Sequence, residues 1–283
     1  MMWIFNSVFG KIFDFIFFLF RNMNPWIGMI LISVLTALLM LFVFRFTSNQ
    51  EGIKRVKNKI KAHLLEFWLF KDSLSLSFKA QGNILRYNLK YISYSTKPML
   101  VMIIPLILIL IQLNLWFGNE ALTPGQETIL KVKLEEGHNP LDIDVALEPS
   151  SGFDIQTPPL RIEERREINW RLKAREKGVH DLTLIVNGQR LIKKLAVAQK
   201  RLSKISPLKV RRNFINELLY PGESPFSGDL PIKTIEVKYP AKSMNLFGWN
   251  IPRLWKIPPW LIVYFVLSII LGFVLKGIFK VEI

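Results

Sequence analysis

Polar side chains are rare inside three long apolar runs of this chain, and they are the residues best placed to do chemistry there. A hydroxyl or amide group in hydrocarbon needs a hydrogen-bond partner, so it faces either protein or a water-filled cavity. We predict that these groups line a hydrophilic groove that receives polar parts of a segment crossing a membrane. The alternative is hydrogen bonding between the helices themselves, which contributes roughly 0.6 kcal/mol per bond. The candidate groove residues are Ser33, Thr36, Arg45, Gln112, Asn114 and Ser268.

Spacing and side-chain type distinguish some of these residues from others. Ser33 and Thr36 are three residues apart, which places them on one face of a helix. Gln112 is the most suggestive, because a side-chain amide in an apolar run requires a partner. Flexible thioethers suit a surface that accepts varied apolar segments, although packing Met is an equally good interpretation. The methionines that are candidates to contact such a segment of another protein, a client, are Met40, Met99 and Met102.

The residues outside the apolar runs give no catalytic pattern. His63, His138 and His180 are scattered, the chain has no cysteine, and neither a nucleophile elbow nor a metal-ligand spacing occurs. We therefore predict a protein that is not an enzyme and that uses no cofactor or metal ion.

The apolar runs are long enough to cross a bilayer. Roughly 20 apolar residues span its core of about 30 Å as a helix, and we place three spans at 25–46, 99–117 and 259–283, the last with a short tail. Residues 1–24 alternate aromatic and polar side chains at helical spacing, which predicts an amphipathic helix in the membrane interface. A fourth span is the alternative, and Asp14 in its middle argues against it.

Residues 47–98 predict a basic helical hairpin between the first two spans. The segment carries ten Lys or Arg against three acidic residues, and its apolar residues recur at three- and four-residue steps. Asp72 and Ser73 can cap its second helix, and Lys97-Pro98 is expected to mark the start of the second span. The hairpin could meet a ribosome or a nascent chain, or it could be a solvated face near anionic lipid, and no nucleic-acid-binding motif is present. The basic residues of its first helix are Lys54, Arg55, Lys57, Lys59 and Lys61.

The excess of basic residues in a short loop indicates the cytoplasmic side. We therefore place the hairpin and the C-terminus in the cytoplasm, and the N-terminus and residues 118–258 outside. We expect an integral protein of a bacterial inner membrane. Its expected partners are membrane lipids, other membrane proteins as clients or fixed subunits, and a ribosome at the hairpin.

Residues 118–258 differ from the apolar runs in their hydrophobic pattern, which is typical of β-strands. Several runs alternate apolar and polar residues, and Asn187-Gly188 is a strong hairpin signal. We predict an external immunoglobulin-like β-sandwich over roughly 124–200, then a short helix starting at Ser206-Pro207, then a further strand. The helix would present an apolar stripe that docks a partner. Its residues are Phe214, Ile215, Leu218 and Leu219.

The predicted fold class is a membrane protein: a three-transmembrane-helix bundle with an N-terminal interfacial helix, a cytoplasmic helical hairpin and the external sandwich. This order of elements resembles the YidC/Oxa insertase superfamily. The resemblance rests on an N-terminal stretch through the first span, on a second span reading KPMLVMIIPLILILIQLNLWF, and on a last span reading PWLIVYFVLSIILGFVLKGIFKV. The last is similar to that of compact three-helix members, such as the insertase subunit of the ER membrane complex and archaeal relatives.

The resemblance implies a function in inserting or assembling membrane proteins. Bacterial members carry an arginine in the groove of the first span, and Thr36 falls near that position here. The block between the second and third spans is not part of the compact core, which implies a specialised member. The competing hypothesis is a non-catalytic scaffold subunit of a larger inner-membrane complex that docks partners through its β-domain.

Overall fold

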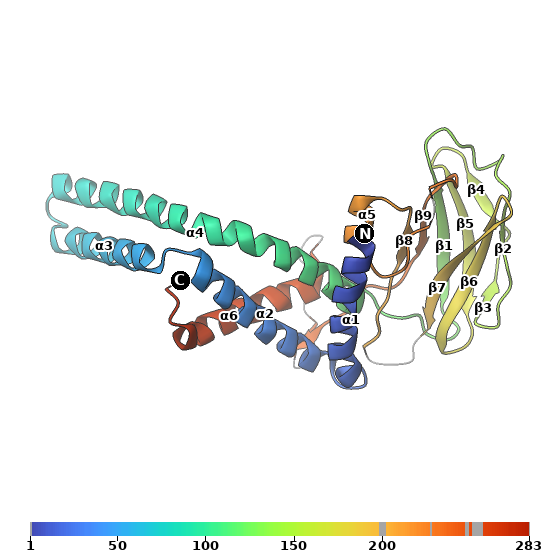
Figure 1. Ribbon diagram of the computed structural model, residues 1–283, viewed down its shortest axis with the longest axis horizontal. Coiled ribbons are helices and arrows are strands. Elements are labelled where there is room, and N and C mark those ends of the chain that lie inside the picture. The colour runs from blue at the N-terminus through green and yellow to red at the C-terminus, as the bar shows by residue number, and fades with distance from the viewer. Residues whose placement is uncertain (1, 198–201, 227, 247–248, 251–256, 283) are drawn as a thin grey trace. The chain divides into compact units, whose positions relative to one another are not determined.

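The computed structural model describes residues 2–197, 202–226, 228–246, 249–250 and 257–282, so the interfacial helix predicted over 1–24 begins outside them. The chain divides into two compact units. The first comprises Met1–Gly28 with Leu110–Ile262, and the second comprises Met29–Ile109 with Val263–Ile283. Figure 1 shows that the first unit contains all the strands, whereas the second is helical.

Three helices among the described residues are long and apolar enough to cross a membrane, as the sequence predicts. They are α2 (Pro25–Thr47), α6 (Pro259–Phe279) and part of α4 (Leu74–Phe117). The helix α4 runs through 44 residues without a break, although it contains Pro98 and Pro105. The predicted start of the second span at Lys97-Pro98 is therefore not accompanied by a break in the helix. A proline removes one backbone hydrogen bond, and the bonds of the turns on either side hold the helix together.

The helix α3 (Gln50–Leu69) packs against the first part of α4 as an antiparallel hairpin (Figure 1). Asn49 caps α3 by accepting a hydrogen bond from the Gly52 backbone N–H at 2.8 Å. A Cβ atom at Gly52 would lie 3.0 Å from the Tyr94 ring, so the glycine permits close approach of the two helices. Farther along the hairpin, the His63 and Tyr87 rings stack with their centres 5.4 Å apart.

Residues 118–246 include two antiparallel sheets. One has the order β3-β5-β1-β9-β8 with β4 paired to β5, and the other has the order β2-β6-β7. The strands of the first are β1 (Glu127–Leu134), β3 (Phe153–Ile155), β4 (Leu160–Ile162), β5 (Glu167–Ala174), β8 (Leu208–Val210) and β9 (Ile232–Val237). Those of the second are β2 (Val145–Leu147), β6 (Gly178–Val186) and β7 (Gln189–Val197), and β10 (Asn245–Leu246) pairs with β11 (Trp249–Asn250).

The two larger sheets share one apolar core, which gives a sandwich-like β-domain. Alternate residues of β1 are buried, as expected for a strand with one face on a core. Trp170 on β5 and Leu184 on β6 both belong to the core cluster. The predicted Asn187-Gly188 turn is confirmed, because both residues have positive φ angles and join β6 to β7.

The second half of the β-domain differs from the sequence prediction. The sandwich extends beyond residue 200, because β9 pairs with the central strand β1 and β8 pairs with β9. Residues 208–210 therefore form a strand, and the helix predicted to start at Ser206-Pro207 begins later, as α5 (Phe214–Leu219). Asn213 caps it by accepting a hydrogen bond from the Asn216 backbone N–H at 2.7 Å.

Candidate polar site within the spans

A buried hydroxyl pair joins the first and third candidate spans within the helical unit. The Tyr264 hydroxyl on α6 donates a hydrogen bond to Thr36 Oγ1 on α2 at 3.2 Å, and both side chains are buried. Ser33 lies one turn before Thr36, and its buried Oγ has no hydrogen-bond partner among the described residues. Ser268 is half-buried one turn after Tyr264. The structure thus places three predicted groove residues, Ser33, Thr36 and Ser268, on two helices that are joined by a hydrogen bond between hydroxyl groups.

This arrangement can exchange hydrogen bonds between hydroxyl groups without any carboxylate, amine or guanidinium. A buried unsatisfied hydroxyl costs about 1–3 kcal/mol, so Ser33 favours any state in which a polar group reaches it. The Tyr264–Thr36 bond holds α6 against α2 and would break if the two helices parted. In the conformation described here Ser33 and Thr36 are covered, so they do not line an open groove.

Gln112 belongs to the other unit, where it packs against α1 (Met2–Phe20). Its Oε1 is buried and has no hydrogen-bond partner among the described residues. A Cβ atom at Gly10 of α1 would lie 3.3 Å from that oxygen, so the glycine leaves room for the amide. Asn114, two residues farther along α4, is exposed. Of the two predicted groove residues on α4, only Gln112 is an internal polar group.

The remaining predicted residues of the spans lie in ordinary surroundings. Arg45 is exposed, with its guanidinium 6.0 Å from the centre of the Phe46 ring. Met40 is half-buried and Met99 is exposed. Met102 packs against the apolar cluster at the base of the hairpin. Of these three methionines, Met99 alone is exposed.

The basic residues of α3 do not all face solvent. Lys54, Lys59 and Lys61 are exposed, as is Arg55, whose guanidinium lies 3.9 Å from Glu51. Lys57 instead forms an ion pair with Glu282 in the C-terminal tail, with Nζ and Oε2 3.0 Å apart. The hydrogen bond and positive charge of Lys57 lower the pKa of Glu282. This pair fixes the tail to the base of the hairpin.

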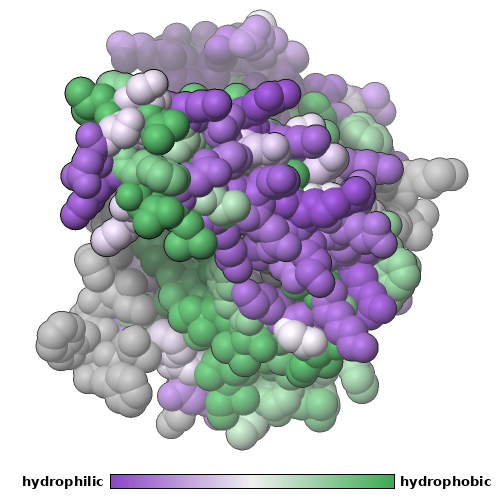
Figure 2. Space-filling model, turned by 90° about the vertical axis from the view of Figure 1, so that its left-hand side faces the viewer, coloured by the Kyte–Doolittle hydropathy of each residue, from purple (hydrophilic) through white to green (hydrophobic). Residues whose placement is uncertain are grey.

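The apolar tip of the hairpin is a feature that the sequence analysis missed. Trp68 is 78% exposed, and its large apolar neighbours around the chain reversal are similarly exposed. The sequence does contain a signal for this surface, because the aromatic residues Phe67, Trp68 and Phe70 lie at the turn between α3 and α4. The prediction rested instead on the basic charge of the segment. Figure 2 shows hydrophobic and hydrophilic residues gathered in separate patches on one face of the molecule. We define the hairpin tip as Leu65, Trp68, Leu69, Leu74 and Phe78.

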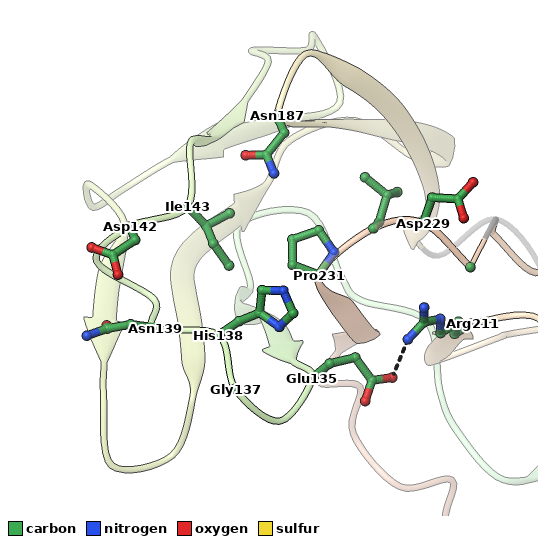
Figure 3. A pocket seen from close by; sticks show the side chains of 12 residues that line it. Glu135, Gly137, His138, Asn139, Asp142, Ile143, Asn187, Arg211, Asp229 and Pro231 are labelled. Carbon is green, nitrogen blue, oxygen red and sulfur yellow. Dashed lines mark ion pairs between the residues drawn. The ribbon is translucent and has the colours of Figure 1, made fainter.

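The β-domain contains a polar pocket of about 440 Å³ between its loops (Figure 3). Arg211 and Glu135 form an ion pair at one side, with Nη1 and Oε1 3.1 Å apart. His138, Asp142 and Asp229 also contribute to its lining. The described residues hold no group of three or more His, Asp or Glu arranged to bind a metal ion. The charges of Arg211 and Glu135 therefore balance each other at that side of the pocket.

The predicted docking residues of α5 are mostly accessible. Phe214, Ile215 and Leu219 are exposed and Leu218 is half-buried, while α5 contacts α1.

Comparison with known proteins found no matching family model, no matching curated protein and no matching solved structure.

Proposed function

We propose that this protein is a non-enzymatic membrane insertase or chaperone of the YidC/Oxa type, which assists the insertion or assembly of other membrane proteins. The observation that carries the proposal is the long helical hairpin between two candidate spans, with basic sides and an exposed apolar tip. A purely solvated basic loop has no reason to display Trp68 and Leu69 at its end. Apolar side chains there can receive the apolar segments of a nascent client.

The polar residues of the spans give the second part of the proposal. A client's polar flank crossing the membrane needs hydrogen-bond partners that lipid does not provide. Parting of α6 from α2 would break the Tyr264–Thr36 bond and uncover Ser33. This mechanism requires no arginine in the groove, no metal ion and no cofactor.

The proposed cellular arrangement follows from the positive-inside rule. The hairpin and tail are cytoplasmic, the protein resides in a bacterial inner membrane, and the β-domain is external with immunoglobulin-like character. The helix α1 lies in the outer interface. A ribosome near the hairpin would bring the client's first apolar segment to the tip.

A scaffold subunit of a larger inner-membrane complex is the second candidate. The observation that favours it is the separate β-domain. Three membrane spans can form a bundle without such a domain, whereas a scaffold needs a domain that docks partners. In that case the hairpin tip would be covered by a fixed partner and would meet no nascent chain.

Disulfide trapping at the hairpin tip separates these functions, because the chain has no cysteine of its own. Leu69→Cys would be tested in membranes against ribosome-bound nascent chains that carry one cysteine in their first apolar segment. Asn58→Cys is the matched control, being exposed on the same helix but outside the tip. We expect a disulfide with the nascent chain at position 69 and little at position 58. A cross-link at position 69 to a constant subunit, unchanged by nascent chains, would replace the insertase proposal with the scaffold.

A further inference from the structure

The helix α1 lies where two candidate spans end. Phe17 packs against Trp116 and Phe117 at the end of α4, with ring centres 4.9 Å and 5.6 Å apart. Only residues 21–24 separate α1 from the start of α2 at Pro25. The helix α1 therefore packs on the last residues of α4 and leads into the first residues of α2, and both of these helices are long and apolar enough to cross a bilayer.

Among residues 8–20, the exposed side chains of α1 are apolar apart from Lys11. Val8, Ile12, Phe15 and Leu19 are exposed at steps of four, three and four residues, which defines one continuous stripe. Asp14 instead pairs with Lys204, with Oδ1 and Nζ 2.8 Å apart. The buried side of α1 is apolar too, with Phe13 and Phe17 in the core, so the helix has apolar side chains on both sides. This pattern suits a helix that has protein on one side and lipid on the other.

The helix α5 also exposes apolar side chains beside α1. It contacts α1, and Glu217 is its buried residue, lying 3.6 Å from the exposed Arg212. Phe214 and Ile215 are 64% and 63% exposed. A six-residue helix that buries its carboxylate and exposes its aromatic side chain is suited to an apolar environment.

We propose that α1 and α5 together form one lipid-facing surface by which the β-domain rests on the membrane interface. The occupant of the exposed α5 face is then the headgroup–acyl boundary of a phospholipid bilayer, in place of the protein partner that the sequence pattern suggested. Continuity with the ends of α2 and α4 favours lipid, because a face beside two emerging spans meets the bilayer first. Basic side chains at the edge of this surface, Arg21 over the Phe18 ring and the exposed Arg212, complement lipid phosphates. The inference depends on the membrane spans and is independent of insertase activity.

The test places an environment-sensitive NBD fluorophore on single cysteines of the full-length protein in vesicles of phosphatidylethanolamine and phosphatidylglycerol. Ile215→Cys probes α5 and Phe15→Cys serves as the α1 reference. Val179→Cys on β6 is the matched control, because Val179 is 60% exposed and Ile215 is 63% exposed. All three positions are accessible, and equal thermal unfolding midpoints would show that labelling leaves the fold intact.

Spin-labelled lipids then report contact with the acyl region. We expect quenching and a blue-shifted emission at positions 15 and 215, and neither at position 179. Emission at position 215 that matches position 179, in vesicles that contain no other protein, would overturn the proposal and leave a protein partner as the occupant of α5.

Discussion

A buried ion pair inside the β-domain holds strand β7 against segments that follow it in the chain. Lys193 on β7 and Glu223 form an ion pair whose side chains are only 1% and 5% exposed, and Lys193 Nζ also donates to the Ser206 carbonyl at 2.6 Å. Desolvation lowers the pKa of Lys193, while the carboxylate of Glu223 opposes that shift. The pair joins β7 to two segments that follow the strand, which the alternating pattern of β7 does not indicate.

Removing one partner of this pair should be costly. We expect Glu223→Leu to destabilise the protein by about 3–5 kcal/mol, because it leaves the Lys193 charge buried and unpaired. The double variant with Lys193→Met should recover most of the loss, since apolar pairs often replace buried ion pairs without cost. Thermal unfolding of the full-length protein in detergent, followed by tryptophan fluorescence, measures both. A double variant as unstable as Glu223→Leu would contradict this explanation.

Lys242 should make stability depend on pH above neutrality. Burial lowers its pKa to about 8, an effect that Glu120 partly offsets. The unfolded chain, with a lysine pKa near 10.4, binds more protons between these values, so this contribution to stability rises as pH increases through that window. The unfolding temperature of the wild type minus that of Lys242→Met should therefore increase between pH 7 and pH 10. A constant difference between the two proteins would contradict the shifted pKa.

At the scale of elements, the sequence is most informative where the pattern is local. The spans and α3 follow from continuous apolar runs and from three- and four-residue periodicity, and Asn187-Gly188 specifies its turn directly. The strand β8 and the start of α5 were mispredicted, because β8 is stabilised by pairing with β9, more than twenty residues away. Pro98 does not interrupt α4, since the surrounding turns outweigh one missing hydrogen bond.

The C-terminal tail is an element whose attachment can be tested. The Glu282 backbone N–H donates to Gln50 Oε1 at 2.7 Å, and its carboxylate pairs with Lys57. Because Lys57 lowers the pKa of Glu282, the attachment is complete above the unfolded pKa of about 4.3 and is lost as pH falls through the folded value. We expect Glu282→Gln to speed hydrogen exchange at the tail, with little change in overall stability for a partly exposed pair.

Glu51→Gln is the control for this experiment, because Glu51 lies on the same helix as Lys57 and its ion pair with Arg55 is exposed. Equal exchange at the tail in both variants would show that the Lys57–Glu282 pair does not hold it.

At the scale of the whole molecule, the predicted topology can be measured with single cysteines. Ser75→Cys in the hairpin and Ser151→Cys in the β-domain are both exposed, whereas Ser77 is buried and donates to the Phe70 carbonyl. An impermeant maleimide applied to intact cells should label position 151 and spare position 75. The reverse labelling would invert the orientation, and with it the assignment of the hairpin to the cytoplasm.

The central claim is that this protein inserts other membrane proteins, and reconstitution tests it most directly. Purified full-length protein in liposomes would be supplied during synthesis of a single-span client with a short polar tail, and protease protection of that tail would be measured. We predict several-fold more protected tail than in protein-free liposomes, with a lower yield for Gln112→Leu, which removes a buried amide whose Oε1 has no hydrogen-bond partner among the described residues. Protection no greater than in lipid alone would contradict the account.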